Sequence, residues 1–154
     1  MLDAAAVLRD LPELHFLFVG AGAQRAWVEA RVTELGLSNV SFQPYQPLDR
    51  LVLSLSVPDV HLVSLKPELE GLIVPSKFYS VLAAGRPVLF VGDPKSEMAR
   101  RIDEAGCGLA FSVGAAADLA SAIRQLASQR WAPGLAVCGP RASSASRRWK
   151  RGKR

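Results

Sequence analysis

The chain has few of the side chains that bind metals or form cross-links. Its 154 residues include two cysteines and two histidines. Cys107 and Cys138 lie far apart and form no Cys-x-x-Cys pair, which predicts incidental thiols in a reducing compartment. His15 and His61 stand alone beside apolar runs, and a metal site needs more ligands than these two. We therefore expect no metal and no cofactor.

The sequence also lacks a long apolar run. Its most apolar stretch, residues 51–65, is interrupted by Pro58, Asp59 and His61. That stretch is shorter than the roughly 20 apolar residues that span a bilayer. The first six residues have neither the basic region nor the apolar core of a signal peptide. We expect a cytoplasmic protein, with peripheral contact at the inner face of the membrane as an open alternative.

Acidic side chains are absent from the last part of the chain. Residues 130–154 carry eight basic side chains, and without them the net charge of +5 becomes −3 for residues 1–129. The basic residues stand among small residues and prolines without periodicity, which is typical of disorder or of a reading-frame shift in a GC-rich gene. We predict one domain over residues 1–129, a disordered basic tail over 130–154, and no nucleic acid partner.

Short apolar runs alternate with segments of helical periodicity throughout residues 1–129. The helical segments have apolar residues three or four positions apart, as at Leu119, Ile123 and Leu126. This alternation predicts an α/β fold, a Rossmann-like doubly wound parallel sheet of five strands with helices on both faces. The strands are expected at residues 15–19, 40–42, 60–65, 87–91 and 108–111.

A glycine turn, Gly20-Ala-Gly22, follows the first expected strand. Ligands of doubly wound sheets bind at the carboxyl ends of the strands, so this turn is a candidate binding element. A dinucleotide-binding turn would have a third glycine at position 25, where this chain has Arg25. It would also have an acid about 20 residues later, where Val40-Ser-Phe-Gln43 is free of acids. A dinucleotide-binding oxidoreductase is therefore the weaker alternative.

The richest motif runs from residue 68 to residue 88. An acidic, glycine-bearing loop with Glu70 leads to Pro75-Ser76, where the serine predicts a helix N-cap. Phe78 and Val81 give that helix an apolar face, and Gly85 ends it. Backbone amides and a helix N-terminus favour phosphates, and a carboxylate accepts hydrogen bonds from sugar hydroxyls. The motif therefore suits a phosphorylated, hydroxyl-rich ligand.

The runs Val-Pro-Ser-Lys-Phe-Tyr at 74–79 and Ala-Ala-Gly-Arg-Pro-Val at 83–88 resemble the donor-binding segment of family 4 glycosyltransferases. These two runs are most similar to the corresponding sequences of those family members that build bacterial exopolysaccharides such as colanic acid. Over about residues 2–127, the resemblance implies the C-terminal half of a retaining enzyme of the GT-B fold, truncated at its N-terminus.

The whole enzyme would transfer a sugar from a nucleoside diphosphate sugar to a lipid-linked or glycan acceptor, with a missing N-terminal domain as partner. In GT-B enzymes, protein cations and a helix dipole replace the metal. The family's upstream Gly-Arg…Lys-Gly segment is absent here, so a non-catalytic nucleotide-sugar-binding remnant remains the alternative. On either alternative, this chain by itself is expected to be inactive.

The resemblance also implies roles for single residues. Glu70 would be the catalytic carboxylate that contacts the donor sugar, with Glu68 as its rival. Ser80 stands where the family has a ribose-binding glutamate, and a neutral hydroxyl makes a weaker contact there. The resemblance implies further donor-binding residues. Three would bind through backbone amides, one begins the helix, one is a lysine that could reach a phosphate, one lies in the glycine turn, and one lies in the segment that holds the base. They are Gly71, Leu72, Ile73, Ser76, Lys77, Gly22 and Tyr45.

Overall fold

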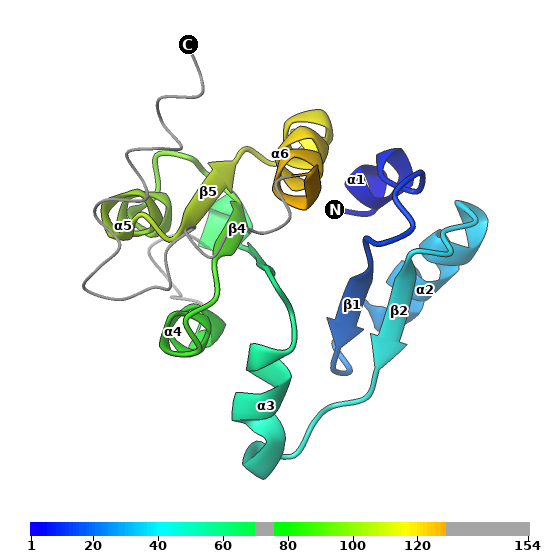
Figure 1. Ribbon diagram of the computed structural model, residues 1–154, viewed down its shortest axis with the longest axis horizontal. Helices are drawn as coiled ribbons and strands as arrows, with labels where there is room; N and C mark the ends of the chain where they lie inside the picture. The colour runs from blue at the N-terminus through cyan, green and yellow to red at the C-terminus, as the bar shows by residue number, and fades with distance from the viewer. Residues whose placement is uncertain (70–75, 129–154) are drawn as a thin grey trace. The chain divides into compact units, whose positions relative to one another are not determined.

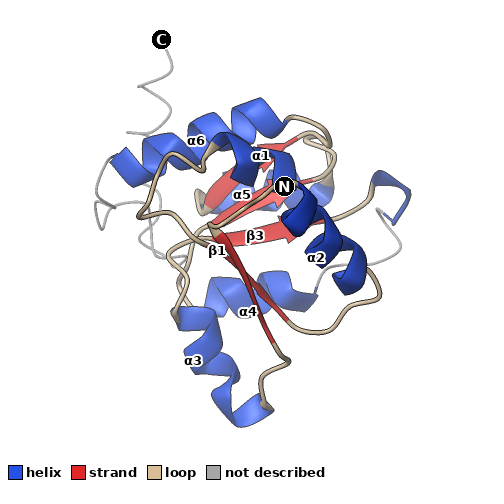
Figure 2. Ribbon diagram, turned by 90° about the vertical axis from the view of Figure 1, so that its right-hand side faces the viewer, coloured by secondary structure: helices blue, strands red, loops and turns tan. Residues whose placement is uncertain are grey.

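The computed structural model describes residues 1–69 and 76–128 (Figure 1). Helices and strands alternate along the chain, as the sequence predicts (Figure 2). The elements in chain order are α1 (Leu2–Val7), β1 (Phe16–Val19), α2 (Arg25–Glu34), β2 (Val40–Gln43), the 3-10 helix η1 (Leu48–Arg50), α3 (Leu51–Ser56), β3 (His61–Ser64), the 3-10 helix η2 (Pro67–Leu69), α4 (Ser76–Ala83), β4 (Val88–Val91), α5 (Glu97–Ala105), β5 (Gly108–Phe111) and α6 (Ala116–Ser128).

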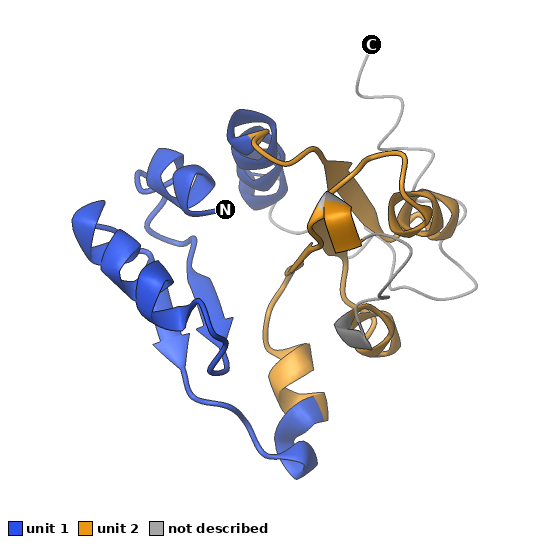
Figure 3. Cartoon of the chain, turned by 180° about the vertical axis from the view of Figure 1, so that it is seen from behind, with its two compact units in different colours: residues 1–51, 116–129 blue, residues 52–115, 130–154 orange. Residues whose placement is uncertain are grey.

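Two compact units make up the chain (Figure 3). The first contains residues 1–51 and 116–129, so α6 returns to the N-terminal part of the fold. The second contains residues 52–115. The prediction of a disordered tail over 130–154 lies outside the described residues. In the described part of the chain, no helix is long and apolar enough to cross a membrane.

Every strand pairing in the described chain is parallel, which confirms the α/β, Rossmann-like prediction. Phe16 of β1 pairs with Val40 of β2, and His61 of β3 pairs with Val88 of β4, which pairs in turn with Gly108 of β5. The expectation of one five-stranded sheet is wrong, because the ladders form a sheet β1-β2 and a sheet β3-β4-β5. Alternating strands and helices favour parallel strands, but the alternation does not specify which strands exchange hydrogen bonds.

Helices α1 and α6 pack against each other in the first unit. The contact buries Leu8 from the end of α1, together with the predicted stripe Leu119, Ile123 and Leu126 of α6. At its rim, Arg124 donates to both carboxylate oxygens of Asp10 at 2.8 Å, and this ion pair lowers the pKa of Asp10. The i, i+4, i+7 spacing therefore identified a true core face.

Helix α2 has no buried side chain. Its apolar residues Trp27, Val28 and Val32 fall at near-helical spacing, which would place them on one face of a helix. Trp27, the largest of them, is exposed, and Val28 and Val32 are half-buried. Helical periodicity shows that a segment can form an amphipathic helix, but burial also needs a partner surface.

The core of the second unit lies around β4, the middle strand of its sheet. Val88, Leu89 and Phe90 are all buried, because β3 and β5 flank β4. Phe78 of α4 and Ile102 of α5 belong to the same buried cluster, as do the side chains of Val63, Val81, Met98, Ala99 and Cys107. Cys107 has none of its surface exposed, as expected of a small residue within a core.

Two glycines allow the chain to follow this path. Gly106 ends α5 with a φ of 61°, a left-handed conformation that glycine adopts at low cost. Gly108 opens β5 opposite Val88, and a Cβ atom there would overlap the Val88 carbonyl. At the other end of α5, the Ser96 hydroxyl accepts a hydrogen bond from the Ala99 amide at 3.0 Å and so caps the helix.

Helix α3 exposes part of its apolar surface. Val52 has 77% of its surface exposed and Leu53 is also exposed, whereas Ser54 and Ser56 are half-buried. Helix periodicity normally places polar residues outside. The helix therefore contributes little to the core through Val52, which makes this residue a useful control for core substitutions.

Candidate functional site

The carboxyl ends of β1 and β2 meet at the glycine turn. The Gly20 amide donates to the carbonyl of Gln43, the last residue of β2, at 3.0 Å, which continues the ladder one residue past the end of β1. The rings of Phe18 and Phe42 stack beside it, with centroids 5.4 Å apart. Gly20 has a φ of 119°, a conformation open to glycine, so the chain can turn here toward α2. The turn thus lies where doubly wound folds bind ligands.

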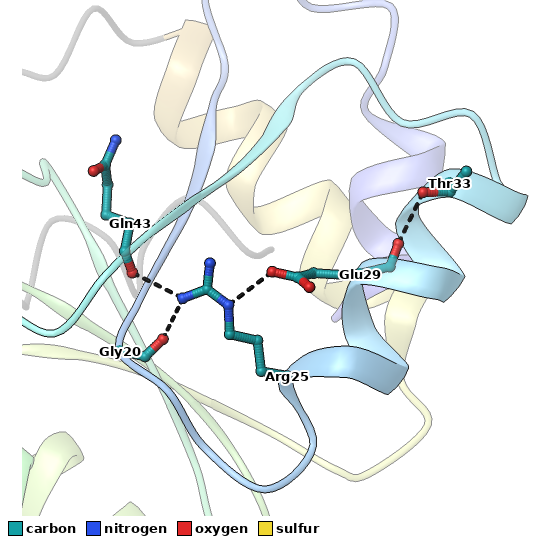
Figure 4. Close-up of polar contacts among 5 residues, drawn as sticks. All are labelled: Gly20, Arg25, Glu29, Thr33 and Gln43. Atoms are coloured by element: carbon teal, nitrogen blue, oxygen red, sulfur yellow. Dashed lines mark hydrogen bonds and ion pairs between the residues drawn. The ribbon is translucent and has the colours of Figure 1, made fainter.

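Arg25 is the most connected side chain at this turn (Figure 4). Its Nη1 donates to the Gly20 carbonyl at 2.6 Å and to the Gln43 carbonyl at 3.1 Å, and its Nε donates to Glu29 at 2.7 Å. The guanidinium carbon also lies 5.4 Å from the centroid of the Phe42 ring, within range of a cation–π contact. The sequence marked position 25 only as a missing glycine. Glu29 four residues later was the available signal of a helix ion pair.

Gly22 and Tyr45, two predicted donor-binding residues, follow these strand ends. Both are exposed, and Tyr45 has 78% of its surface exposed. A Cβ atom at Gly22 would meet nothing within 4 Å. Both residues are therefore accessible at the end of the sheet, although the structure shows no contact between them.

Helix α4 holds three of the predicted donor-binding residues, Ser76, Lys77 and Ser80. Ser76 is its first residue rather than its N-cap, a difference of one position at a helix boundary. Ser80 is half-buried, Phe78 belongs to the core, and Tyr79 is exposed with its ring edge-to-face to that of Phe78. This agrees with the reading of Phe78 as a core residue. The predicted residues Glu70, Gly71, Leu72 and Ile73 lie outside the described residues, as do the side chains of Ser76 and Lys77.

A shallow hollow lies between α4 and α5. It is lined by Tyr79 and Leu82 on one side and by Arg101 and Glu104 on the other. The Arg101 guanidinium donates to Glu97 at 2.6 and 2.9 Å, which raises the pKa of Arg101 and lowers that of Glu97. Glu97, the first residue of α5, is thus held in an ion pair. Gly22, Tyr45 and Ser80, the predicted donor-binding residues whose side chains or surroundings the structure describes, do not line this hollow.

His61 and Arg86 both bind the C-terminal end of α3. The His61 Nε2 lies 2.8 Å from the Leu55 carbonyl, which can only accept, so this nitrogen carries the proton. Arg86 donates to the Ser56 carbonyl. Burial lowers the pKa of His61 and the nearby Arg86 charge lowers it further, against the hydrogen bond to Leu55, which raises it. The ring is therefore neutral in the folded chain near pH 7.

We expect the free energy of unfolding to fall as the pH drops through 6.5, the ordinary pKa of histidine. Unfolded His61 takes up a proton there before the folded ring does, so acid favours the unfolded chain. Urea unfolding followed from about pH 8 to about pH 5 measures this, and His61→Gln should reduce the slope. Equal slopes for wild type and His61→Gln would contradict the assignment.

Metal ligands do not cluster in the structure. Within residues 1–69 and 76–128, no group of three or more histidine, cysteine or acidic side chains is close enough to hold an ion. His61 binds a backbone carbonyl and His15 binds the Ser41 hydroxyl, with 2.7 Å between Nε2 and Oγ. The two histidines thus have structural partners in separate parts of the chain.

Comparison with known proteins identifies the class to which this chain is similar, the glycosyltransferases. A protein of Escherichia coli K12 named as a colanic acid biosynthesis glycosyl transferase, WcaI, is 35% identical over 98 residues, which are 64% of this chain and 24% of that protein. A protein of Pseudomonas aeruginosa named as a glycosyltransferase, WbjE, is 37% identical over 93 residues, which are 60% of this chain and 23% of that protein.

These similarities confirm the predicted resemblance to bacterial glycosyltransferases, including the colanic acid context. The chain spans about a quarter of the length of each of these relatives. No family model and no solved structure matches it.

Proposed function

We propose that this chain is the donor-binding part of a retaining GT-B glycosyltransferase that acts in cell-surface polysaccharide synthesis. It would bind a nucleoside diphosphate sugar for transfer to a lipid-linked or glycan acceptor. The similarity to two proteins named as glycosyltransferases carries this proposal. The parallel strands with exposed Gly22 and Tyr45 at their carboxyl ends support it, because doubly wound folds bind nucleotides there.

The division of roles follows the chemistry of the donor. Glu70 would accept hydrogen bonds from the sugar, and the amides of residues 71–73 with the start of α4 would bind the phosphates. Lys77 would add a cation for the diphosphate, and Ser80 would bind a ribose hydroxyl through its neutral oxygen. Gly22 and Tyr45 would border the donor at the carboxyl ends of β1 and β2. Protein groups rather than a metal would then stabilise the departing diphosphate.

The geometry of Arg25 disfavours the dinucleotide-binding alternative. A third glycine at this position would allow a close approach of helix and strand. In this chain the position carries a guanidinium that binds the carbonyls of Gly20 and Gln43. Position 25 therefore holds a long side chain where the dinucleotide fingerprint has a glycine.

We predict that the purified 154-residue chain binds nucleoside diphosphates weakly and forms no glycosidic product. Backbone amides and a helix start can hold phosphates without a second domain, whereas transfer needs donor and acceptor held together in a closed, desolvated cleft. Titrations with uridine and guanosine diphosphate at two salt concentrations test binding, which should weaken with salt.

A product assay on the same preparation tests transfer. Failure to bind either nucleotide would argue against the donor-binding role. Sustained product formation that Glu70→Ala abolishes would show instead that the chain, in one copy or several, completes the active site by itself.

A further inference from the structure

We infer that Arg25 is a positioning residue for the donor. Its guanidinium forms a bridge of hydrogen bonds between the two strand ends that precede Gly22 and Tyr45. This inference rests on the proposed function for the identity of the ligand. The bridge itself is a feature of the structure. No predicted role included Arg25, because the sequence shows it only as a departure from the dinucleotide pattern.

The carbonyls of Gly20 and Gln43, one at each strand end, both point toward the Arg25 guanidinium (Figure 4). Gly22 lies two residues after Gly20, and Tyr45 lies two residues after Gln43. Arg25 Nη1 donates to the carbonyls at which the two loops leave the strands, at 2.6 Å to Gly20 and 3.1 Å to Gln43. The Gln43 carbonyl also accepts from the Gly20 amide at 3.0 Å. A shift of the backbone at Gly20 or Gln43, where the two loops begin, therefore has to lengthen a bond to Arg25.

The shape of the guanidinium matters as much as its charge. Glu29, one helical turn along α2, binds Nε at 2.7 Å and so sets the rotation of the planar group. With Nε held there, Nη1 faces the two carbonyls, and the plane lies beside the Phe42 ring. A lysine has a single nitrogen on a flexible stem and cannot make the same contacts together. The bridge thus requires arginine.

The charge of Arg25 also changes the character of the strand ends. Carbonyl oxygens at the carboxyl ends of β1 and β2 would repel an anionic donor. Because Arg25 donates to the carbonyls of Gly20 and Gln43, their partial negative charge is compensated within the protein. The turn near Gly22 then presents less negative charge to a diphosphate. Arg25 would therefore favour donor binding in two ways, by positioning the two loops and by compensating the charge of the carbonyls.

Arg31 provides a matched control on the same helix. It forms an ion pair with Glu34 at 2.8 Å, and its side chain is 37% exposed against 31% for Arg25. The described structure gives Arg31 no hydrogen bond to a strand carbonyl. Loss of Arg31 removes a helix ion pair of similar exposure. A difference between the effects of Arg25→Ala and Arg31→Ala therefore measures the contribution of the two hydrogen bonds from Arg25 to the strand-end carbonyls.

The experiment measures amide hydrogen exchange by NMR in the 154-residue chain and in Arg25→Ala, Arg25→Lys and Arg31→Ala. The Gly20 amide reports the strand ends, and the Leu35 amide, which donates to the Arg31 carbonyl at 3.0 Å, reports the far end of α2. We expect Arg25→Ala to speed exchange at Gly20 by about tenfold and to leave Leu35 unchanged. Arg25→Lys should lie between, and Arg31→Ala should leave Gly20 unchanged. Unchanged Gly20 exchange in Arg25→Ala would overturn the bridge.

Titration with uridine and guanosine diphosphate then tests the link to the donor. For whichever nucleotide binds wild type, we expect Arg25→Ala to lower the affinity by about tenfold. Arg25→Lys should recover part of this affinity, and Arg31→Ala should have the affinity of wild type. Equal affinity in Arg25→Ala, despite faster Gly20 exchange, would overturn the positioning role.

If wild type bound neither nucleotide, the proposed function would fail and the donor link with it, while Gly20 exchange would still decide the bridge. Should Arg25→Ala not fold, Arg25→Lys and Glu29→Gln take its place. Both keep a polar side chain and disturb the bridge, so both should speed Gly20 exchange. Unchanged exchange in both variants would overturn the inference.

Discussion

Replacement of Phe90 by alanine is expected to lower the free energy of unfolding by about 3–5 kcal/mol. Phe90 has none of its surface exposed and lies in β4, between β3 and β5. Its ring belongs to the buried cluster that also contains Phe78 and Ile102, so its removal leaves a cavity that the rigid sheet cannot close. The free energy of unfolding of a natural protein is about 5–15 kcal/mol in total, so this variant should lose a large part of its stability. Urea unfolding followed by circular dichroism measures the change.

Val52→Ala is the matched control for this loss. Val52 is apolar too, but it is 77% exposed on α3, so its truncation should change stability by no more than about 0.5 kcal/mol. A volume-retaining change, Phe90→Leu, should cost less than Phe90→Ala because the cavity is smaller. If Phe90→Ala and Val52→Ala cost the same, the core of the second unit would not be centred on β4.

Replacement of Glu70 by alanine is expected to weaken binding of the nucleotide sugar by roughly ten- to a hundredfold. The reason is the loss of a hydrogen bond from a sugar hydroxyl to a carboxylate, and charged hydrogen bonds of this kind contribute about 1.5–3 kcal/mol. Glu70 lies outside the described residues, so the prediction rests on the resemblance. Titrations compare uridine- and guanosine-diphosphate sugars with the corresponding diphosphates. Only the affinity gained from the sugar should disappear.

Two further substitutions make this test specific. Glu68→Ala removes the exposed rival carboxylate in η2 and should leave sugar binding unchanged. Ser80→Ala removes a neutral contact to ribose and should weaken the diphosphate and its sugar alike, by about two- to tenfold. If Glu68→Ala had the large effect, the carboxylate roles would be exchanged. If Ser80→Ala were the most damaging, the assignment of the ribose site would be wrong.

The local elements follow directly from local signals in the sequence. Leu119, Ile123 and Leu126 lie on one face of α6 because their spacing matches the helical turn. Gly85 and Gly106 end their helices because positive φ angles, 68° and 61°, are readily available to glycine. The apolar run at β4 is buried because parallel strands are covered on both sides. Each of these outcomes depends on residues close together in the chain.

The resemblance to glycosyltransferases was also present in the sequence alone. The segments around Ser76 and Gly85 suggested it, and the similarity to the relatives confirms it. The individual donor-binding residues remain predictions, because Glu70 lies outside the described structure. Gly22, Tyr45 and Ser80 are placed on accessible or half-buried positions without a ligand contact. Sequence therefore indicated the class of protein, and binding measurements have to assign the site.

Tertiary structure alone decided which distant residues meet. The strands form two sheets rather than one, and no side chain of α2 is buried, because strand neighbours and partner surfaces depend on the packing of the whole chain. Arg25 is the sharpest case. The sequence shows an arginine in place of a glycine, whereas the fold brings the Gln43 carbonyl, 18 residues away, within 3.1 Å of its guanidinium. A hydrogen bond depends on distance and direction in space, so only the folded chain reveals it.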